Sequence, residues 1–300
     1  MKKAMKALKE RIGKDVLLLD GAMGTQLMAR GISAGTCNDH LNETDPDTVA
    51  AVHRCYLDAG SDAILTNTFG ANSLALARHG LAGRVVQINS AGADIARAAA
   101  GRDHYVLGDI GPCGDFLEPV GTVKPGDLKE AFTVQAAALA KGQVDGFLVE
   151  SFTDVKEAAT AVEAAKSAAD LPVFVSMAFD GAGKGFRTMM GAEVDSAVEK
   201  LLGLGVEAIG FNCGKADLDD YVELAGRFVR AVRRLYPTAA VLAEPNAGLP
   251  EMDDGRLVYR VGPDDFAEAA ARIRSAGVSI IGGCCGTGPE HIAAARRLLG

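Results

Sequence analysis

Two adjacent cysteines, Cys284 and Cys285, are the residues of this 300-residue chain whose types and spacing most suggest chemistry. They stand between glycines at the end of an apolar run, in segment 280–287, which reads IIGGCCGT. A third cysteine, Cys213, lies in the similar segment 211–214, which reads FNCG. Three converging thiolates would make a sulfur-rich zinc site with one coordination position open to a substrate. The pattern therefore indicates chemistry on a thiol.

The elements that must position these cysteines follow one repeated pattern: a short apolar run, a loop with glycine or polar residues, and a longer amphipathic stretch rich in alanine. The apolar runs cover residues 16–20, 62–67, 105–109, 146–150, 173–177, 208–211, 240–244 and 278–283. Helical spacing covers residues 46–59, 85–100, 127–141, 154–169, 195–204, 218–235 and 263–276. Apolar strands that alternate with helices indicate a parallel sheet, and eight of them predict an α/β fold, the (β/α)8 TIM barrel.

We predict a single domain over residues 1–300, because we find no linker or low-complexity segment long enough to divide the chain. A barrel of this kind typically needs about 250 residues. Residues 1–14 alternate basic and apolar residues at helical spacing. They are expected to form an N-terminal helical extension that closes the bottom of the barrel.

The unusual residues fall directly after the predicted strands, on the face where barrel enzymes keep their active sites. Cys213 follows the sixth strand, and Cys284 and Cys285 follow the eighth. Because both strands flank the seventh, the three cysteines can converge although they are distant in the sequence. Asp20 and Glu150 end the first and fourth strands on the same face.

Charge and cysteine content argue against several classes of protein. The chain has 31 basic and 39 acidic residues, a net charge of -8, and so offers no electrostatic footprint for nucleic acid. No apolar run reaches the length of a signal peptide core, about 7–15 residues, or of a membrane span, about 20. Six cysteines without a secretory signal do not indicate a disulfide framework. We expect a cytoplasmic protein that binds neither nucleic acid nor membranes.

Five motifs, in this order, resemble those of the homocysteine S-methyltransferase family. They read DGAMGT at 20–25, TNTF at 66–69, NCG at 212–214, PNAG at 245–248 and GGCCGT at 282–287. The resemblance covers residues 16 to 299 and is greatest to the homocysteine-binding barrel of cobalamin-dependent methionine synthase. It implies a TIM barrel that methylates the thiol of L-homocysteine, giving methionine. It also implies one zinc ion held by Cys213, Cys284 and Cys285, which act as both the metal ligands and the catalytic cysteines.

Zinc ligation has a physical advantage for such a reaction. A free aliphatic thiol has a pKa near 8.5 and is mostly protonated at neutral pH, whereas the thiolate is the nucleophile. Coordination to zinc deprotonates the thiol outright. Three cysteine thiolates already make the zinc site negative, so a fourth sulfur keeps enough electron density to attack a methyl group.

An amino acid substrate also needs partners for its ammonium and carboxylate groups. Asp20 and Glu150 would bind the ammonium, as the resemblance implies. The backbone amides of Gly21, Ala22 and Met23 suit the carboxylate, because glycine lets the backbone approach closely and exposed amides favour anions.

Other substrate-pocket residues are expected in the loops after the second and seventh strands. Thr66 and Asn67 would lie at its floor or rim. Many family members have glutamate before this pair, whereas Leu65 stands here and is expected in the barrel wall. Asn246 is a hypothetical fourth zinc ligand before the substrate arrives, and the alternative is a simple turn asparagine.

The methyl donor is less clearly indicated than the acceptor. The wider family suggests a methyl-corrinoid, S-methylmethionine or betaine. An onium donor favours an aromatic box, but the chain has no tryptophan and only 5% aromatic residues. We therefore expect methylcobalamin or another methyl-corrinoid that is not permanently bound. Because the chain lacks the D-x-H-x-x-G cobalamin motif, the corrinoid would arrive in trans on a separate protein or free in solution.

Two other functions stay open at this point. One is a metal-free or Mg2+-dependent barrel lyase, in which Asp20, Glu150 and Asn246 would supply oxygen ligands. The other is a noncatalytic barrel that holds zinc and homocysteine for a partner. Zinc content after replacement of Cys213 tests the first alternative, and turnover tests the second.

The remaining cysteines and the histidines are given no role in the chemistry. Cys37, Cys55 and Cys113 are expected to be small buried apolar side chains. The five histidines fall in no ligand pattern. His291, near a predicted helix start, is expected to cap that helix at the surface.

Overall fold

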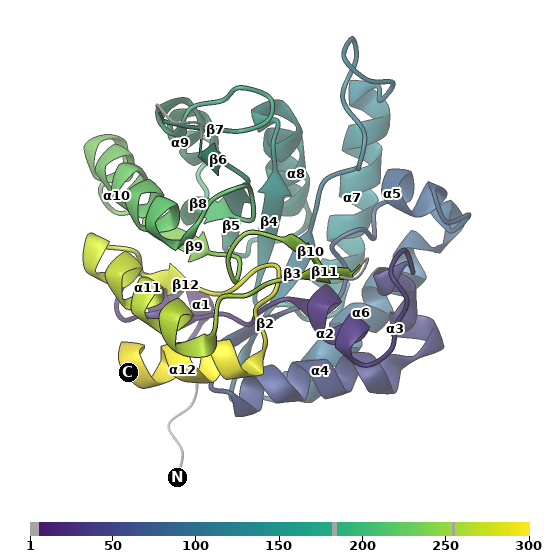
Figure 1. Cartoon of the computed structure of the whole chain (residues 1–300). Helices are drawn as coiled ribbons and strands as arrows, with labels where there is room; N and C mark the ends of the chain where they lie inside the picture. The colour runs from purple at the N-terminus through teal and green to yellow at the C-terminus, as the bar shows by residue number, and fades with distance from the viewer. Residues whose placement is uncertain (1–5, 182–184, 254–255) are drawn as a thin grey trace.

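The computed structural model describes residues 6–181, 185–253 and 256–300, and its centre is a sheet of eight parallel strands. The strands are β1 (Leu17–Leu18), β2 (Ala63–Leu65), β3 (Tyr105–Ile110), β4 (Gly146–Phe152), β5 (Val173–Met177), β8 (Ala208–Asn212), β9 (Ala240–Glu244) and β12 (Ile280–Ile281). Their order is β1-β12-β9-β8-β5-β4-β3-β2. Figure 1 shows the strands curling into a barrel inside a ring of helices, so the predicted TIM barrel is confirmed.

The sheet closes between β1 and β2 through the residues before β2 rather than through a strand ladder. Asp62 accepts a hydrogen bond from the Leu18 amide at 2.9 Å and donates its own amide to the Leu18 carbonyl at 2.7 Å. The hydroxyl of Ser61 donates to the Leu19 carbonyl at 3.2 Å. These contacts hold β1 beside β2 and bring the C-terminal strand ends to one rim.

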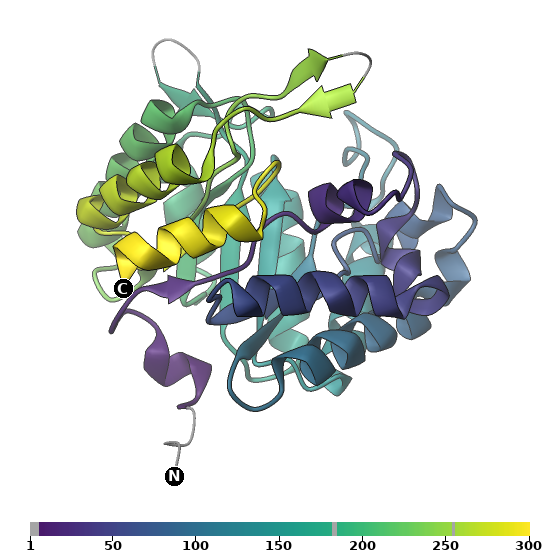
Figure 2. The same ribbon diagram turned by 60° about the horizontal axis from the view of Figure 1, so that its bottom comes forward.

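Amphipathic helices cover the outside of the barrel (Figures 1 and 2). They are α4 (Pro46–Asp58), α6 (Val85–Ala100), α7 (Pro125–Lys141), α8 (Val155–Ala168), α9 (Val194–Leu202), α10 (Leu218–Leu235), α11 (Pro263–Ala276) and α12 (Pro289–Leu299). In α10, Asp217 and Asp220 form a capping box, and Arg233 and Arg234 lie in the last turn. Both features complement the helix dipole.

Shorter elements lie in the connections between strands and helices. They are α1 (Leu8–Arg11), α2 (Met23–Ala29), η1 (Asn38–His40), α3 (Leu41–Thr44), α5 (Ser73–Ala77), η2 (Ala82–Arg84) and the hairpins β6 (Asp180–Gly181) with β7 (Phe186–Arg187) and β10 (Glu251–Asp253) with β11 (Arg256–Val258). Figure 2 shows β10 and β11 projecting beyond the barrel rim. The sequence did not predict either hairpin, because neither has a continuous apolar run.

The barrel interior is a packed apolar plug rather than a channel. Its buried side chains are Leu8, Leu17, Leu19, Ala63, Tyr105, Leu107, Leu148, Phe174, Ala208, Ala240, Leu242 and Ile280. Leu8 of α1 joins this cluster at the N-terminal ends of the strands, where a Cβ on Gly146 would lie 3.0 Å from its Cδ2. The Tyr105 hydroxyl donates to the Lys6 carbonyl at 2.8 Å. Segment 6–11 therefore covers the bottom of the barrel.

A layer of polar side chains lies on top of this plug. Side chains alternate along a strand, so each inward-facing position recurs every second residue. Leu107 is followed in this way by Asp109, Leu148 by Glu150, and Leu242 by Glu244. The change from apolar to acidic residues therefore marks the level at which the packed core ends and the site begins.

Among the described residues, no helix is long and apolar enough to cross a membrane.

His53 of α4 is fully buried, and neither of its ring nitrogens has a hydrogen-bond partner among the described residues. Burial, with a smaller effect of Arg54, lowers its pKa from 6.5 to about 4. The folded state therefore takes up this proton less readily than the unfolded state, so stability is lost as the pH falls from about 6.5 toward 4.

We expect the wild type to lose about 2 kcal/mol of unfolding free energy through His53 between pH 7 and pH 5. The variant His53→Leu should lack this component, since leucine fills a similar volume and does not titrate. Urea unfolding of both proteins at the two pH values measures the difference. Parallel losses in the two proteins would contradict the assignment to His53.

Candidate metal and substrate site

Three cysteine sulfurs meet at the C-terminal rim of the barrel. Cys213 directly follows β8, and Cys284 and Cys285 lie between β12 and α12. The Sγ atom of Cys285 lies 4.0 Å from those of both Cys213 and Cys284, and the three lie within 4.8 Å of one another. Thiolates at about 2.3 Å from one tetrahedral zinc are about 3.8 Å apart, so the spacing fits such an ion. No other group of potential ligands in the described residues meets this spacing.

The three thiols also form hydrogen bonds with one another. Hydrogen bonds from Cys213 and Cys284 lower the pKa of Cys285 to about 3. The cluster thus favours a thiolate at Cys285, which is the form of cysteine that binds metals.

Asn212, the last residue of β8, connects this cluster to the neighbouring strands. Its Nδ2 donates to Oγ of Ser151 at 2.6 Å, to Oε2 of Glu150 at 3.3 Å and to Sγ of Cys284 at 3.7 Å. Its Oδ1 accepts from the amide of Ser151 and the hydroxyl of Ser176, both at 3.0 Å. One fully buried carboxamide therefore orients both an acidic group and a sulfur.

Two residues beside Asn212 have a left-handed backbone, which is uncommon for residues other than glycine. Ser151 has a φ of 65° and Cys213 a φ of 51°. The Tyr221 hydroxyl donates to the Cys213 carbonyl at 2.8 Å, and Asn212 holds the amide of Ser151. Such strain persists only where surrounding contacts hold it, and it is concentrated at functional sites.

A cavity of about 520 Å³ opens at this rim and brings most of the predicted residues together. Its lining includes Asp20, Gly21, Ala22, Thr66, Asn67, Glu150, Cys213, Cys284 and Cys285. Leu65 also lines it and packs against the apolar plug, as expected for the barrel wall.

The turn after β1 brings to the cavity the amides that we expect to bind a carboxylate, but one of them is already engaged. The Ala22 amide donates to the Thr287 carbonyl at 3.2 Å, whereas those of Gly21 and Met23 donate to no described residue. A Cβ on Gly21 would lie 2.7 Å from Oγ1 of Thr287, so this approach requires glycine. The same hydroxyl donates to the Cys284 carbonyl at 2.6 Å and joins the turn to the cysteine loop.

Thr66 and Asn67 lie in the cavity lining, but their polar atoms also serve the fold. The Thr66 hydroxyl lies 2.6 Å from that of Thr68 and accepts from the Asp109 amide at 2.9 Å. The Asn67 Nδ2 donates to Oδ1 of Asn42 at 3.1 Å. These bonds brace the loop after β2, and a contact with substrate stays a prediction for both residues.

Asn246 lies beside the cysteine cluster and is not part of the cavity lining. It is 2% exposed, and its Nδ2 donates to the Gly214 carbonyl at 3.2 Å. Its Oδ1 is buried without a hydrogen-bond partner in the described structure. Buried polar atoms normally have a partner, so an unpaired oxygen next to the Cys213 loop is compatible with a metal ligand.

The acidic residues of the cavity have strongly shifted pKa values. Burial raises the pKa of Asp20 well above its usual value, although the Leu65 amide donates to Oδ2 at 3.0 Å. Burial, followed by the charge of Cys213, raises the pKa of Glu150 to about 8. Three further acids that the sequence did not assign to the site also line the cavity, Asp39, Asp109 and Glu244. For Asp109 and Glu244, the inward-facing position two residues after a buried leucine was an available signal.

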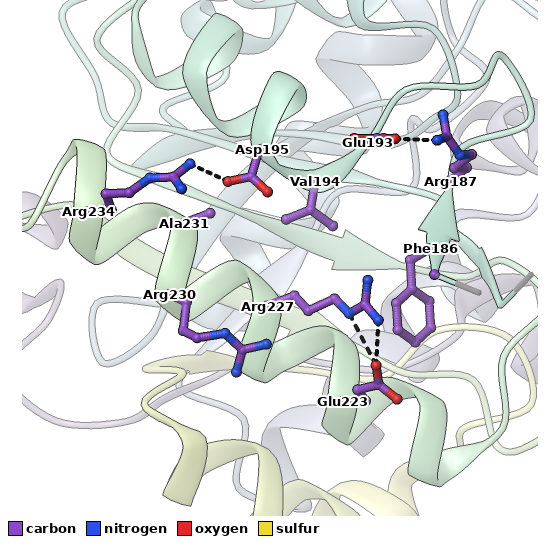
Figure 3. A pocket seen from close by; sticks show the side chains of 11 residues that line it. Phe186, Arg187, Glu193, Val194, Asp195, Glu223, Arg227, Arg230, Ala231 and Arg234 are labelled. Carbon is purple, nitrogen blue, oxygen red and sulfur yellow. Dashed lines mark hydrogen bonds and ion pairs between the residues drawn. The ribbon is translucent and has the colours of Figure 1, made fainter. Parts of the chain in front are cut away.

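A second hollow of about 530 Å³ lies on the outside of the barrel, between α9, α10 and the β6–β7 hairpin. Figure 3 shows Arg227 beside the Phe186 ring and paired with Glu223, while Arg187 and Arg234 pair with Glu193 and Asp195. Its acidic groups are thus neutralised by its own arginines. This hollow contains none of the predicted site residues, and we place the functional site at the barrel rim.

Comparison with known proteins bears directly on the resemblance. Residues 17–299 match the family model described as homocysteine S-methyltransferase. This chain belongs to the homocysteine S-methyltransferase family. The match includes every residue predicted for the site and covers nearly the whole barrel.

Curated relatives of this family member include the methionine synthases of Mycobacterium tuberculosis and Mycobacterium leprae, each 35% identical to it. The alignments cover 94% and 95% of the chain but 24% of either synthase, so the chain spans about a quarter of the length of these relatives. The metallated form of the homocysteine methyltransferase MmuM from Escherichia coli has a similar fold. Its TM-score is 0.77 at 22% identity, covering 97% of this chain and 98% of that one.

The other cysteines and His291 of this family member differ in part from expectation. Cys113 is buried as predicted, but Cys37 and Cys55 are only partly buried. Cys37 lies in the lining of the rim cavity, and Cys55 of α4 accepts a hydrogen bond from Arg30 at 3.3 Å. His291 does cap α12, accepting from the Gly288 amide at 3.0 Å. It is buried rather than at the surface, since its Nε2 lies 2.9 Å from the Val261 carbonyl.

The variant Asn212→Ala should lower the unfolding free energy by about 2–4 kcal/mol, because it removes a fully buried carboxamide and leaves several partners unsatisfied. Ser176→Ala removes one of these hydrogen bonds and should cost about 1 kcal/mol. Urea unfolding in the presence of a chelator measures both without a metal contribution. Equal, small losses would show that the hydrogen bonds of Asn212 do not organise the rim.

Proposed function

We propose that this chain transfers a methyl group to the thiol of L-homocysteine, with zinc on Cys213, Cys284 and Cys285 and a methyl-corrinoid as donor. The observation that carries the proposal is the cluster of three cysteine sulfurs, all within 4.8 Å of one another, at the edge of a cavity suited to an amino acid. When bound, zinc would keep the substrate sulfur as a reactive thiolate. Membership of the homocysteine S-methyltransferase family supports homocysteine as the substrate.

The chain's own residues would orient homocysteine around this sulfur position. Asp20, two residues after β1, and Glu150 of β4 line the cavity and would accept hydrogen bonds from the ammonium. The amides of Gly21 and Met23 remain available for the carboxylate. Asn212 donates to both Glu150 and Cys284, so the ammonium group and the sulfur of homocysteine would be held at fixed positions relative to each other. The sulfur would then form a bond to the methyl carbon while the bonding electrons leave with the donor.

The surface around the cavity favours a large donor that approaches from outside. Met28 and Phe69 line the mouth and are 47% and 42% exposed, and Leu249 and Met252 beyond β9 are 48% and 69% exposed. Phe69 and Tyr259 are the aromatic residues in the described lining. Two aromatic side chains make a poor box for an onium donor such as betaine or S-methylmethionine. This supports a methyl-corrinoid supplied in trans, on a separate corrinoid protein or free.

The donor set also argues against a magnesium-dependent lyase at this site. Magnesium prefers oxygen ligands in octahedral geometry, whereas thiolates select softer metals such as zinc. Three sulfurs within 4.8 Å of one another would be a poor magnesium site. A noncatalytic homocysteine-binding barrel differs from the proposed enzyme in turnover alone.

The first test is homocysteine-dependent demethylation of methylcobalamin, followed by absorbance at known zinc content. The wild type should bind about one zinc per chain and turn over. Cys284→Ala should lose zinc and at least about a hundredfold of the rate, because even indirect partners of metal ligands cost 10–100-fold. Cys113→Ala, a buried cysteine outside the cavity, is the matched control. Full activity of Cys284→Ala without zinc would refute the proposal.

Asn246 is proposed as the fourth ligand before homocysteine binds, through its unpaired Oδ1. The variant Asn246→Ala should then weaken zinc binding about tenfold without homocysteine and leave it nearly unchanged with homocysteine, whose sulfur would occupy the same position. Competition with a chromogenic chelator measures both affinities. An equal effect under the two conditions would assign Asn246 a purely structural role in its loop.

A further inference from the structure

The three ligand cysteines are themselves open to the cavity at which a methyl donor would arrive. Cys213, Cys284 and Cys285 all belong to its lining, and each of these residues is partly exposed. A zinc ion held by them would carry three cysteine sulfurs and one substrate sulfur, which are chemically alike. Methylation of a cysteine would damage the metal site, because a thioether is neutral and the thiolate is the metal ligand. Selective methylation therefore requires a difference between the substrate sulfur and the ligand sulfurs.

A hydrogen-bond donor from outside the cysteine cluster lies beside the sulfur of Cys285. Tyr259 follows β11, lines the cavity and forms a side-chain hydrogen bond with Cys285. A zinc-bound thiolate has no proton, so the phenol hydroxyl is the donor. The Tyr259 ring packs on Gly286, where an added Cβ would lie 2.3 Å from its Cγ. The glycine therefore allows the ring to lie close against the cysteine loop.

The other two ligand sulfurs also have donors. Nδ2 of Asn212 donates to Sγ of Cys284 at 3.7 Å, and the backbone amide of Gly214 donates to the sulfur of Cys213. Gly214 has a φ of 80°, and a Cβ there would lie 2.1 Å from the Phe179 carbonyl oxygen, so this position requires glycine. Each ligand sulfur is thus paired with a donor that the surrounding fold holds in place.

The fourth coordination position has a different neighbour. Asn246 uses its Nδ2 on the Gly214 carbonyl at 3.2 Å, and its Oδ1 is unpaired among the described residues. An oxygen of this kind cannot donate a hydrogen bond to a sulfur. A substrate thiolate that replaces this oxygen on the metal would therefore gain no hydrogen bond from it.

A hydrogen bond to a thiolate lowers its reactivity toward a methyl group. Hydrogen bonds to charged acceptors are stronger than those between neutral groups. As the sulfur forms its bond to the methyl carbon, negative charge passes from the sulfur to the leaving group, so such a hydrogen bond weakens in the transition state. An interaction that stabilises the reactant more than the transition state slows the reaction. Donors on the three ligand sulfurs would leave the substrate sulfur as the most reactive of the four.

We infer that the Tyr259 hydroxyl, with Asn212 and the amide of Gly214, determines which sulfur is methylated, by suppressing attack from the three ligand cysteines. The inference rests on the proposed function, in which zinc holds these sulfurs beside that of homocysteine. Tyr259 gives the clearest test, because phenylalanine keeps the ring on Gly286 and removes the hydroxyl alone.

Methyl iodide is a probe small enough to reach every sulfur of the cluster. It is added to the zinc-loaded protein without homocysteine, after the zinc content of each variant has been measured. A cysteine sulfur forms the new bond to carbon, the carbon–iodine bond breaks, and iodide leaves with the bonding electrons. Peptide mass spectrometry with fragmentation then measures the methylation rate at Cys213, Cys284 and Cys285 separately.

Tyr259→Phe should raise the methylation rate of Cys285 about tenfold relative to that of Cys213 in the same protein, because it removes one charge-assisted hydrogen bond. The rate at Cys284 should stay close to that of the wild type. Tyr236→Phe, which removes a tyrosine hydroxyl at the end of α10 and outside the cavity, is the matched control and should leave all three rates unchanged.

An unchanged ratio of Cys285 to Cys213 methylation in Tyr259→Phe would overturn the inference. So would an equal increase at Cys284 and Cys285 or at all three sulfurs, since a loosened loop or a lost zinc ion accounts for that without a hydrogen bond. Failure of the proposed function gives a different result. A zinc-loaded wild type that does not methylate homocysteine overturns the function while the ratio still decides the inference, and a wild type that binds no zinc overturns both.

Discussion

Closure of the barrel is the constraint on which the site depends. β12 lies between β1 and β9, so the loop that carries Cys284 and Cys285 stands between the turn after β1 and the loop after β9. On the other side of β1, Asp62 supplies the hydrogen bonds that a strand ladder would otherwise make. A closed ring brings residues from opposite ends of the chain around one cavity. An open sheet of the same strands would place Asp20 far from Glu150.

Most of the fold could be predicted because each barrel strand is a continuous apolar run, and each helix that covers it has an amphipathic period. The bounds of β5 and β9 agree with the predicted runs to the residue. The hairpins β6–β7 and β10–β11 could not be predicted in this way, since each of their strands has only two or three residues and neither hairpin has a continuous apolar run. The burial of His291 likewise depends on Val261, a contact that spacing along one helix does not reveal.

The sequence placed the three cysteines correctly because strand ends of a parallel barrel share a rim. It did not reveal which polar atoms the fold itself uses. The backbone amide of Ala22 donates to Thr287, and the side-chain amide of Asn67 donates to Asn42. These contacts join segments that are distant in the sequence, so no local sequence pattern indicates them. Asn212 was part of a recognised motif, yet its role in joining Glu150 to Cys284 requires the register of β8 against its neighbours. The arrangement of polar groups at this rim therefore depends on packing between segments as much as on residue type.

The positions of segment 6–11 and of the end of α12 limit how another protein module could be joined to this barrel. α12 begins beside the cysteine loop and runs away from the rim, and Arg296 in its last turn donates to the Gly60 carbonyl before β2. The first described residue, Lys6, contacts Tyr105 at the start of β3, so Lys6 and the C-terminal end of α12 both lie toward the face opposite the cavity. The 18-residue helix α10 indicates a barrel height of about 27 Å. A module tethered at either end would need at least about eight residues of fully extended linker to reach the rim. Shorter tethers would leave the cavity accessible only to molecules that diffuse to it.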